Sequence, residues 1–266
     1  MKLVRLTTIV ALSTTILAGG AAVAFAEEAR EVTTEGKVQF RSSGAGDGEL
    51  EVINPETGPD APDVEIDPII PGTTGPLSIV MAPKMDFGTQ VISNQDQIYN
   101  MVAEMANLAD GSGEVPYVSF AQVQDLRGTN DGWDLQVSLS DFESESQNKI
   151  LTGAEIEFVN SRIQYEGINS QNAPEAHSAG LKLIPGAGAR PVMTANEGKG
   201  AGASSVVWGN QQALNQQFSS EDFDPEEDVI ENDAIQLSVP GSTAKDATTY
   251  TSTLSWELTT TPGTDA

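Results

Sequence analysis

Two tryptophan motifs constrain the fold of this chain more than any other feature of its sequence. Trp133-Asp134-Leu135 and Trp256-Glu257-Leu258 each lie in a run where apolar and polar residues alternate. A period of two is typical of a strand with one buried face, so the Trp and Leu of a motif project to the same side, roughly 7 Å apart. The motifs therefore predict two half-buried strands, whose apolar faces carry Trp133, Leu135, Val137 and Leu139 in the first, and Tyr250, Leu254, Trp256 and Leu258 in the second.

Most of the remaining chain also reads as short strands separated by turn signals. Residues 98–108 differ, because their apolar side chains follow helical spacing and predict a short helix. Residues 185–203 read as a loop rich in Gly and Ala. Many short strands with little helix favour an all-β fold, and we expect a Greek-key-like β-sandwich with long loops and at most one short helix. The other predicted strands are 35–40, 77–81, 91–92, 118–125, 154–165, 181–184, 204–208 and 235–239.

The N-terminus has the pattern of a secretory signal peptide. Lys2 and Arg5 precede a mostly small and apolar stretch that ends at Ala24-Phe25-Ala26, a cleavage site of the A-x-A type. An uncleaved membrane anchor is the alternative, but the small residues weaken the stretch as a lipid span. We expect residues 1–26 to be removed and residues 27–266 to form the exported domain, with no direct membrane anchor after cleavage.

Charge and cysteine content exclude several classes of protein. The chain has 13 Lys and Arg against 39 Asp and Glu, and the exported part keeps 11 against 39, a formal charge of −28. Such a charge argues against nucleic acid as a partner, because nucleic-acid binding relies on basic contacts to phosphate. It also argues against adsorption to an anionic membrane. The chain has no Cys, which excludes disulfides and an N-terminal lipid anchor.

Two segments are strongly acidic. Residues 42–76 hold six of the 14 Pro, eight acids and no base, and are predicted to be a linker or a long loop on the domain surface. Residues 221–233 hold eight acids and no base. Carboxylates bind calcium, but the spacing of an EF-hand is absent, and a solvated acidic loop is the preferred interpretation. No metal or other cofactor is predicted.

Other candidate residues are best explained by structure. Trp and Leu on one strand face are core residues by default, although an indole is also a good platform for a sugar ring. His177 is the only His, and a catalytic triad would have to use it, yet no nucleophile elbow is present. Asp125 and Arg127 are predicted to form an ion pair or turn cap, and the segment between Trp208 and Phe218 to be a core strand and loop.

In these elements the sequence resembles the WxL-domain surface proteins of Gram-positive bacteria. The similarity covers nearly the whole exported chain, and its most specific part is the ending Y-x-x-x-L-x-W-x-L at residues 250–258. The positions between Trp and Leu are acidic here, whereas many family members carry Thr or Ser. The other matching segments are Gly75-Pro76-Leu77, Asp86-Phe87-Gly88, Val123-Gln124-Asp125-Leu126-Arg127-Gly128 before Trp133, and Leu237-Ser238-Val239-Pro240-Gly241.

The resemblance implies a non-enzymatic protein that is held on the cell wall without covalent linkage, by binding peptidoglycan. It also implies assembly with other surface proteins. The end at Thr264-Asp265-Ala266, without an apolar segment and basic tail, agrees with non-covalent retention. An adhesin for a host or environmental ligand and an exported polysaccharide hydrolase are the alternatives. The ligand-binding residues expected from the resemblance are Trp133, Leu135, Tyr250, Leu254, Trp256 and Leu258.

Overall fold

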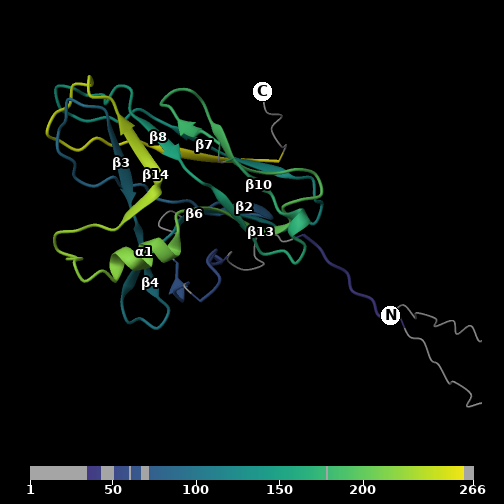
Figure 1. Cartoon of the computed structure of the whole chain (residues 1–266). Coiled ribbons are helices and arrows are strands. Elements are labelled where there is room, and N and C mark those ends of the chain that lie inside the picture. Colours follow the sequence, from purple (N-terminus) through teal and green to yellow (C-terminus); the bar gives the residue numbers. More distant parts are fainter. Residues whose placement is uncertain (1–34, 43–50, 60, 67–71, 178, 261–266) are drawn as a thin grey trace, which may run out of the picture. The chain divides into compact units, whose positions relative to one another are not determined.

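The described chain is built mostly of short antiparallel strands, with one α-helix among its elements (Figure 1). The computed structural model describes residues 35–42, 51–59, 61–66, 72–177 and 179–260. No helix within these ranges is long and apolar enough to cross a lipid bilayer. The strands are β1 (Val64–Glu65), β2 (Leu77–Met81), β3 (Gln97–Val102), β4 (Glu104–Leu108), β5 (Glu114–Tyr117), β6 (Ser119–Asp125), β7 (Trp133–Leu139), β8 (Glu155–Phe158), β9 (Arg162–Tyr165), β10 (Glu175–Ala176), β11 (Leu181–Leu183), β12 (Arg190–Ala195), β13 (Gly202–Trp208), β14 (Glu231–Val239) and β15 (Leu254–Thr259).

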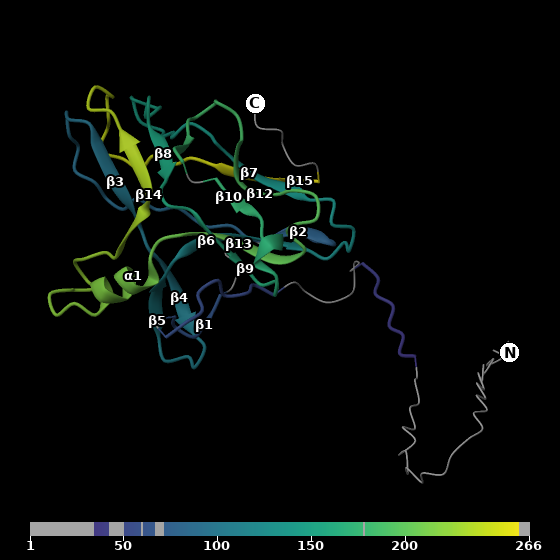
Figure 2. The same cartoon turned by 45° about the vertical axis from the view of Figure 1, so that its right-hand side comes forward.

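These strands form four small antiparallel sheets. Three sheets have four strands each, in the orders β10-β12-β7-β15, β11-β8-β14-β3 and β2-β6-β13-β9, and a three-stranded sheet has the order β1-β4-β5. Figure 2 shows the strands of the first sheet, here called the β7 sheet, next to one another, and α1 (Gln211–Phe218) beside the three-stranded sheet. The prediction of a mostly β chain with one short helix is therefore confirmed.

The two-layer sandwich is the part of the fold prediction that the topology does not reproduce. The chain leaves one sheet and enters another with a single residue between the strands. Only Ala103 separates β3 from β4, and only Val118 separates β5 from β6, although each pair belongs to two different sheets. Such changes of sheet after a single residue divide the strands among several small sheets. The alternation of apolar and polar residues along a strand does not reveal them.

Two apolar cores hold the sheets together. The larger core contains the inward residues of the three four-stranded sheets, including Trp133, Phe158 and Trp208. The smaller core joins the three-stranded sheet to α1 and to the outer side of β6 and β13, through Tyr117, Leu214 and other buried residues. Removing these large side chains from water is the main stabilising contribution to the fold.

The helix lies elsewhere than the sequence pattern predicted. Residues 98–108 form β3 and β4, because pairing with β14 and β5 overrides the helical spacing. Two residues of the predicted helical stripe, Ile98 and Met105, are exposed. The observed helix α1 begins after Asn210, whose side chain accepts a hydrogen bond from the N–H of Ala213 at 3.0 Å. This helix follows directly on β13, in a segment predicted to be strand and loop.

Several strand predictions also need correction. Residues 35–40 and the pair Val91 and Ile92 form no strand, and both segments are exposed. Conversely, the predicted loop at 185–203 contains β12, which pairs with β7 on one side and β10 on the other. Pro191 hides this strand in the sequence, and a register shift between Pro191 and Met193 accommodates it.

The acidic segment at 42–76 is not a free linker in its described parts. Val64 is buried in the smaller core, and β1 pairs with β4. The N–H of Ile53 donates to the Gln122 side chain at 2.9 Å, and the same side chain donates back to the Ile53 carbonyl at 2.7 Å. The described parts of the segment are thus attached to the domain.

Candidate functional site

The two tryptophan motifs lie side by side, on adjacent antiparallel strands. Leu258 of β15 is directly opposite Leu135 of β7, and Trp256 is opposite Val137. Residues that face each other across an antiparallel pair project to the same side of the sheet. The motifs are 123 positions apart in sequence, yet their apolar side chains form one continuous face of the β7 sheet.

The first motif lies entirely in the core. The side chains of Trp133 and Leu135 are both 0% exposed. The indole N–H of Trp133 donates to the carbonyl of Gly200 at 3.1 Å, so the polar atom of this residue is satisfied inside the protein. Because β7 has neighbours on both sides, its backbone is also covered. Trp133 therefore has no surface with which to contact a ligand in this conformation.

The second motif is only half-buried. Trp256 packs on the ring of Trp208, with centroids 6.3 Å apart, and Trp208 packs on Phe158 at 4.5 Å. Leu254 and Leu258 flank Trp256 and are likewise partly exposed. One edge of each of these side chains reaches the surface while the other edge contacts the core. The second motif is therefore the one that a ligand can reach.

The backbone of β15 adds to this accessible site. The N–H of Ser140 donates to the carbonyl of Thr253 at 3.0 Å, which fixes the alternation of the ladder between β7 and β15. The N–H and C=O groups of Leu254, Trp256 and Leu258 consequently point away from β7. No other described strand pairs with this side of β15. The half-exposed residues thus combine apolar side chains with outward hydrogen-bonding groups.

Tyr250 closes the loop that leads into β15. Its hydroxyl donates to the carbonyl of Asn148 at 2.8 Å and accepts from the N–H of Asp246 at 3.0 Å. Asn148 also borders a shallow surface hollow of about 470 Å³. The hollow is lined by both polar and apolar residues, namely Asn148, Ile150, Thr152, Gly153, Pro240, Ser242, Thr243 and Ala244.

The acidic residues inside the two motifs differ in solvent exposure, as the two tryptophans do. Asp134 is 1% exposed and accepts hydrogen bonds from Thr194 Oγ1 at 2.5 Å and from Gln136 Nε2 at 2.6 Å. Glu257, at the equivalent position of the second motif, is exposed. Asp134 is therefore part of the structure of the β7 sheet, whereas Glu257 contributes only surface charge.

His177 belongs to the same hydrogen-bond chain, but the arrangement is not a catalytic triad. Its Nε2 lies 2.8 Å from Thr194 Oγ1, and the hydroxyl of Thr194 donates to Asp134. In a triad the imidazole lies between the hydroxyl and the carboxylate, so that it can accept the hydroxyl proton. Here the hydroxyl lies between them and donates its hydrogen bond to the carboxylate, not to the imidazole. This series of hydrogen bonds connects His177, directly after β10, with Thr194 on β12 and Asp134 on β7.

The turn before β7 contains a structural ion pair between Asp125 and Arg127, as predicted. Arg127 Nη2 lies 2.7 Å from Asp125 Oδ2, and its Nε donates to Oδ1 at 2.9 Å. The same Nη2 donates to the carbonyl of Gly132 at 2.8 Å. Hydrogen bonding to Asp125 raises the pKa of Arg127. The guanidinium of Arg127 thereby stabilises the turn that precedes Trp133 at the start of β7.

Carboxylates of the acidic loop at 221–233 are engaged by the loop's own backbone. These carboxylates accept hydrogen bonds from backbone N–H groups of the loop itself. For example, the N–H of Glu226 donates to Asp224 Oδ1 at 3.0 Å. Within the described ranges, no group of three or more His, Cys, Asp or Glu residues is placed to hold a metal ion.

Sequence reasoning missed Trp208 as a neighbour of the second motif. It identified this residue only as part of a core strand, which it is, with its indole N–H donating to Ser161 Oγ at 2.7 Å. Its contact with Trp256 depends on the packing of two different sheets, β13 on β15, and no local pattern predicts that contact.

Comparison with known proteins agrees with this geometry. Neither the curated proteins nor the solved structures contained a match. The sequence does match the family model described as WxL domain surface cell wall-binding, over residues 27–262. Members of that family are binding domains located at the cell wall. Because the match spans nearly the whole chain, this protein belongs to the WxL family of surface, cell wall-binding domains.

Proposed function

We propose that the protein is a non-enzymatic surface protein that binds peptidoglycan and is thereby held non-covalently on the wall of a Gram-positive cell. The observation that carries this proposal is the position of Trp256, half-exposed on a strand with one open edge and supported from behind by Trp208. An indole fixed in this way presents apolar area to a sugar ring at little cost in side-chain entropy.

The six motif residues take two roles in this proposal. Tyr250, Leu254, Trp256 and Leu258 form the contact surface, together with the outward backbone groups of β15. Trp133 and Leu135 support that surface from the core, because Leu135 lies directly opposite Leu258. The hollow that Asn148 borders adjoins Tyr250. Its hydroxyl and amide groups suit the hydroxyls of a neutral glycan, and Ile150 and Pro240 add apolar surface for a sugar ring.

We further infer that residues 1–26 are an export signal and residues 27–266 the exported domain. The basis is the basic start, the apolar run and the Ala24-Phe25-Ala26 site. Mass spectrometry of the secreted protein tests this inference, with Glu27 expected at the N-terminus.

A sedimentation assay with insoluble peptidoglycan tests the proposed ligand. Purified residues 27–266 are expected to sediment with peptidoglycan that has been stripped of teichoic acid. Trp256→Ala is expected to weaken binding about tenfold or more, as truncation of a central aromatic contact does. Glu257→Ala is the matched control on the same strand, and it is expected to bind as the wild type or better. Equal binding by Trp256→Ala and the wild type would contradict a site on β15.

The strong negative charge gives a second test of the same proposal. At −28 the exported chain is repelled by anionic teichoic acid, so its binding should survive moderate salt and improve as pH falls toward about 4, where carboxylates protonate. Strong denaturant should release the protein from cells without muramidase. A steep loss of binding in sodium chloride at neutral pH would instead favour an adhesin with a basic ligand.

A further inference from the structure

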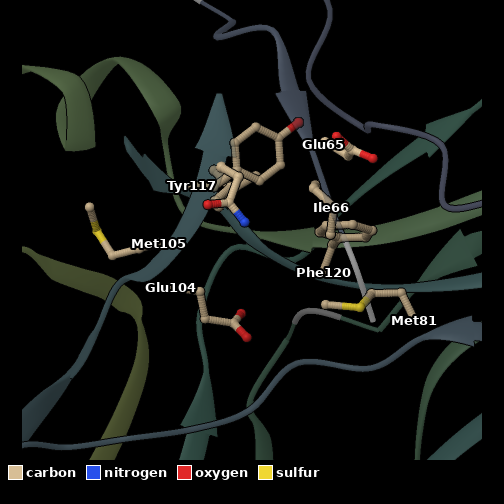
Figure 3. Close-up of a pocket in the computed structure, with 10 residues that line it drawn as sticks. Glu65, Ile66, Met81, Glu104, Met105, Tyr117 and Phe120 are labelled. Carbon is tan, nitrogen blue, oxygen red and sulfur yellow. The ribbon is translucent and has the colours of Figure 1, made fainter. Parts of the chain in front are cut away.

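A second hollow lies away from the tryptophan motifs, where the three-stranded sheet meets β2 and β6. It has a volume of about 270 Å³. This is just below the roughly 300 Å³ at which pockets for small molecules begin, and it suits a group the size of one long side chain. Figure 3 shows residues that line it, which are Glu65, Ile66, Met81, Glu104, Met105, Ala106, Asn107, Tyr117, Val118 and Phe120.

The inner walls of this hollow are aromatic and sulfur-containing. Tyr117 and Phe120 are both 2% exposed, and their rings meet edge to face with centroids 6.3 Å apart. Met81 is 5% exposed and completes the floor. The Tyr117 hydroxyl accepts a hydrogen bond from the N–H of Glu56 at 3.2 Å, which fixes the ring. The walls are therefore rigid and offer π-faces and a polarisable thioether.

A carboxylate interrupts these apolar walls. Glu104 lies on the inward side of β4, the side that also carries buried Ala106, and is directly opposite Tyr117 on β5. In Figure 3 its carboxylate points toward the same space as Met81. Burial raises the pKa of Glu104, while a hydrogen bond from the backbone N–H of Lys84 to Oε1, at 3.0 Å, and one from the side chain of Ser119 oppose this rise.

Glu104 lacks a close basic partner. The ammonium of Lys84 acts on it electrostatically, but none of the ion pairs seen among the described residues includes Glu104. A second carboxylate, Glu65, lies at the exposed mouth beside Asn107, its cross-strand partner. The hollow thus has a negative group inside, another at the entrance, and aromatic rings between them.

We propose that this hollow binds a primary ammonium group on an unbranched alkyl chain, as in the side chain of lysine. The methylene groups would contact Met81 and Phe120, while the ammonium would pair with Glu104 and face the aromatic rings. An anion would be repelled, and a neutral apolar group would leave the carboxylate without a cationic partner. The planar fork of a guanidinium is wider and fits so narrow a space less well.

The same chemistry occurs in two sources, a lysine in a peptidoglycan stem peptide and a lysine in a basic segment of a partner protein. The proposal does not depend on the binding of glycan by β15, because no motif residue lines this hollow. Binding at the two sites can therefore be separated by experiment.

Methionine methyl resonances provide a direct test. The full exported protein, labelled with ¹³C at its Met methyl groups, is titrated with n-butylammonium and, as the uncharged control of similar size, n-butanol. The Met81 and Met105 signals are expected to shift with n-butylammonium, while that of Met193, buried in the other core, stays constant. Butanol is expected to bind about tenfold more weakly, because it lacks the charged hydrogen bond.

Three variants complete the test. Glu104→Gln keeps the shape of the side chain and is expected to weaken n-butylammonium binding about tenfold, with Glu65→Gln weakening it less. Glu114→Gln, on β5 outside the hollow, removes the same charge and is expected to have no effect. Equal affinity of Glu104→Gln and wild type, or of butanol and butylammonium, would overturn the proposal, and so would an absence of Met81 shifts.

Two further ligands distinguish the sources. A soluble stem peptide with a free lysine amine and an unstructured lysine-containing peptide are titrated in parallel, each beside its Nε-acetylated form. We expect at least one free-amine peptide to shift Met81 and its acetylated form not to. The free-amine peptide that binds more tightly identifies the source, whereas loss of discrimination by acetylation would contradict recognition of an ammonium group. These results hold whether or not Trp256→Ala retains wall binding.

Discussion

The strands β7 and β15 carry the same tripeptide pattern but lie in different environments. β7 has neighbours on both sides and buries Trp133 completely, whereas β15 is an edge strand and leaves Trp256 half-exposed. A motif residue is therefore not a functional residue by its type alone. Position within the sheet divides the pair into a structural tryptophan and an accessible one.

The largest expected effect separates the two tryptophans by stability. Trp133→Ala should lower the free energy of unfolding by about 3–5 kcal/mol, because it empties a fully packed site. Trp256→Ala should cost about 1–2 kcal/mol, because part of the side chain already contacts water. Urea unfolding at neutral pH measures both values. Similar losses for the two variants would remove the distinction between a core motif and a surface motif.

A glycine pair tests how tightly Trp133 is enclosed. Gly200 has a φ of +73°, and an added Cβ would lie 2.5 Å from Ala195 Cβ and 2.7 Å from Trp133 Nε1. Gly200→Ala should therefore cost about 2–4 kcal/mol, from left-handed strain together with overpacking. Gly128 is the control, since its φ is +74° but no atom lies within 4 Å of the added Cβ. Gly128→Ala should cost only the strain, about 1–2 kcal/mol. If the two variants melted alike, the Trp133 pocket would have room to spare.

The smallest effect in this series compares the two acids within the motifs. Asp134→Ala should lower stability by about 1–3 kcal/mol, because the hydroxyl of Thr194 and the amide of Gln136 lose their buried acceptor. Glu257→Ala should change stability by no more than about 0.5 kcal/mol. Thermal melting of both variants tests this difference. A large loss for Glu257→Ala would contradict the conclusion that Glu257 contributes only surface charge.

Local patterns predicted individual strands well, but they predicted poorly which strands pair with one another. Strands were predicted correctly at β6, β7 and β14, and the alternation predicted for β7 was correct, because Trp133, Leu135, Val137 and Leu139 all lie in the larger core. The helix predicted at 98–108 was wrong, because the exposed positions of Ile98 and Met105 happen to coincide with helical spacing. β12 was missed, because Pro191 and the surrounding glycines read as loop, although the strand lies between two others in its sheet.

For the candidate sites, too, the sequence predicted local patterns but not contacts between sheets. The sequence predicted that Tyr250, Leu254, Trp256 and Leu258 share a strand face. Leu254, Trp256 and Leu258 do so on β15, whereas Tyr250 lies in the loop before that strand. It did not predict that Trp208 would support Trp256, or that Glu104 would stand among Tyr117, Phe120 and Met81. Both arrangements depend on contacts between different sheets.

By itself, the sequence determined the mostly β character of the chain, the side of each motif strand that is apolar, and the family. These properties follow from the two-residue period of a strand and from motif order, which are local quantities. Tertiary structure alone decided that β7 is central and β15 is at the edge. Strand pairing is chosen by the burial and hydrogen bonding of the whole chain, so segments that are distant in sequence set the exposure of each tryptophan.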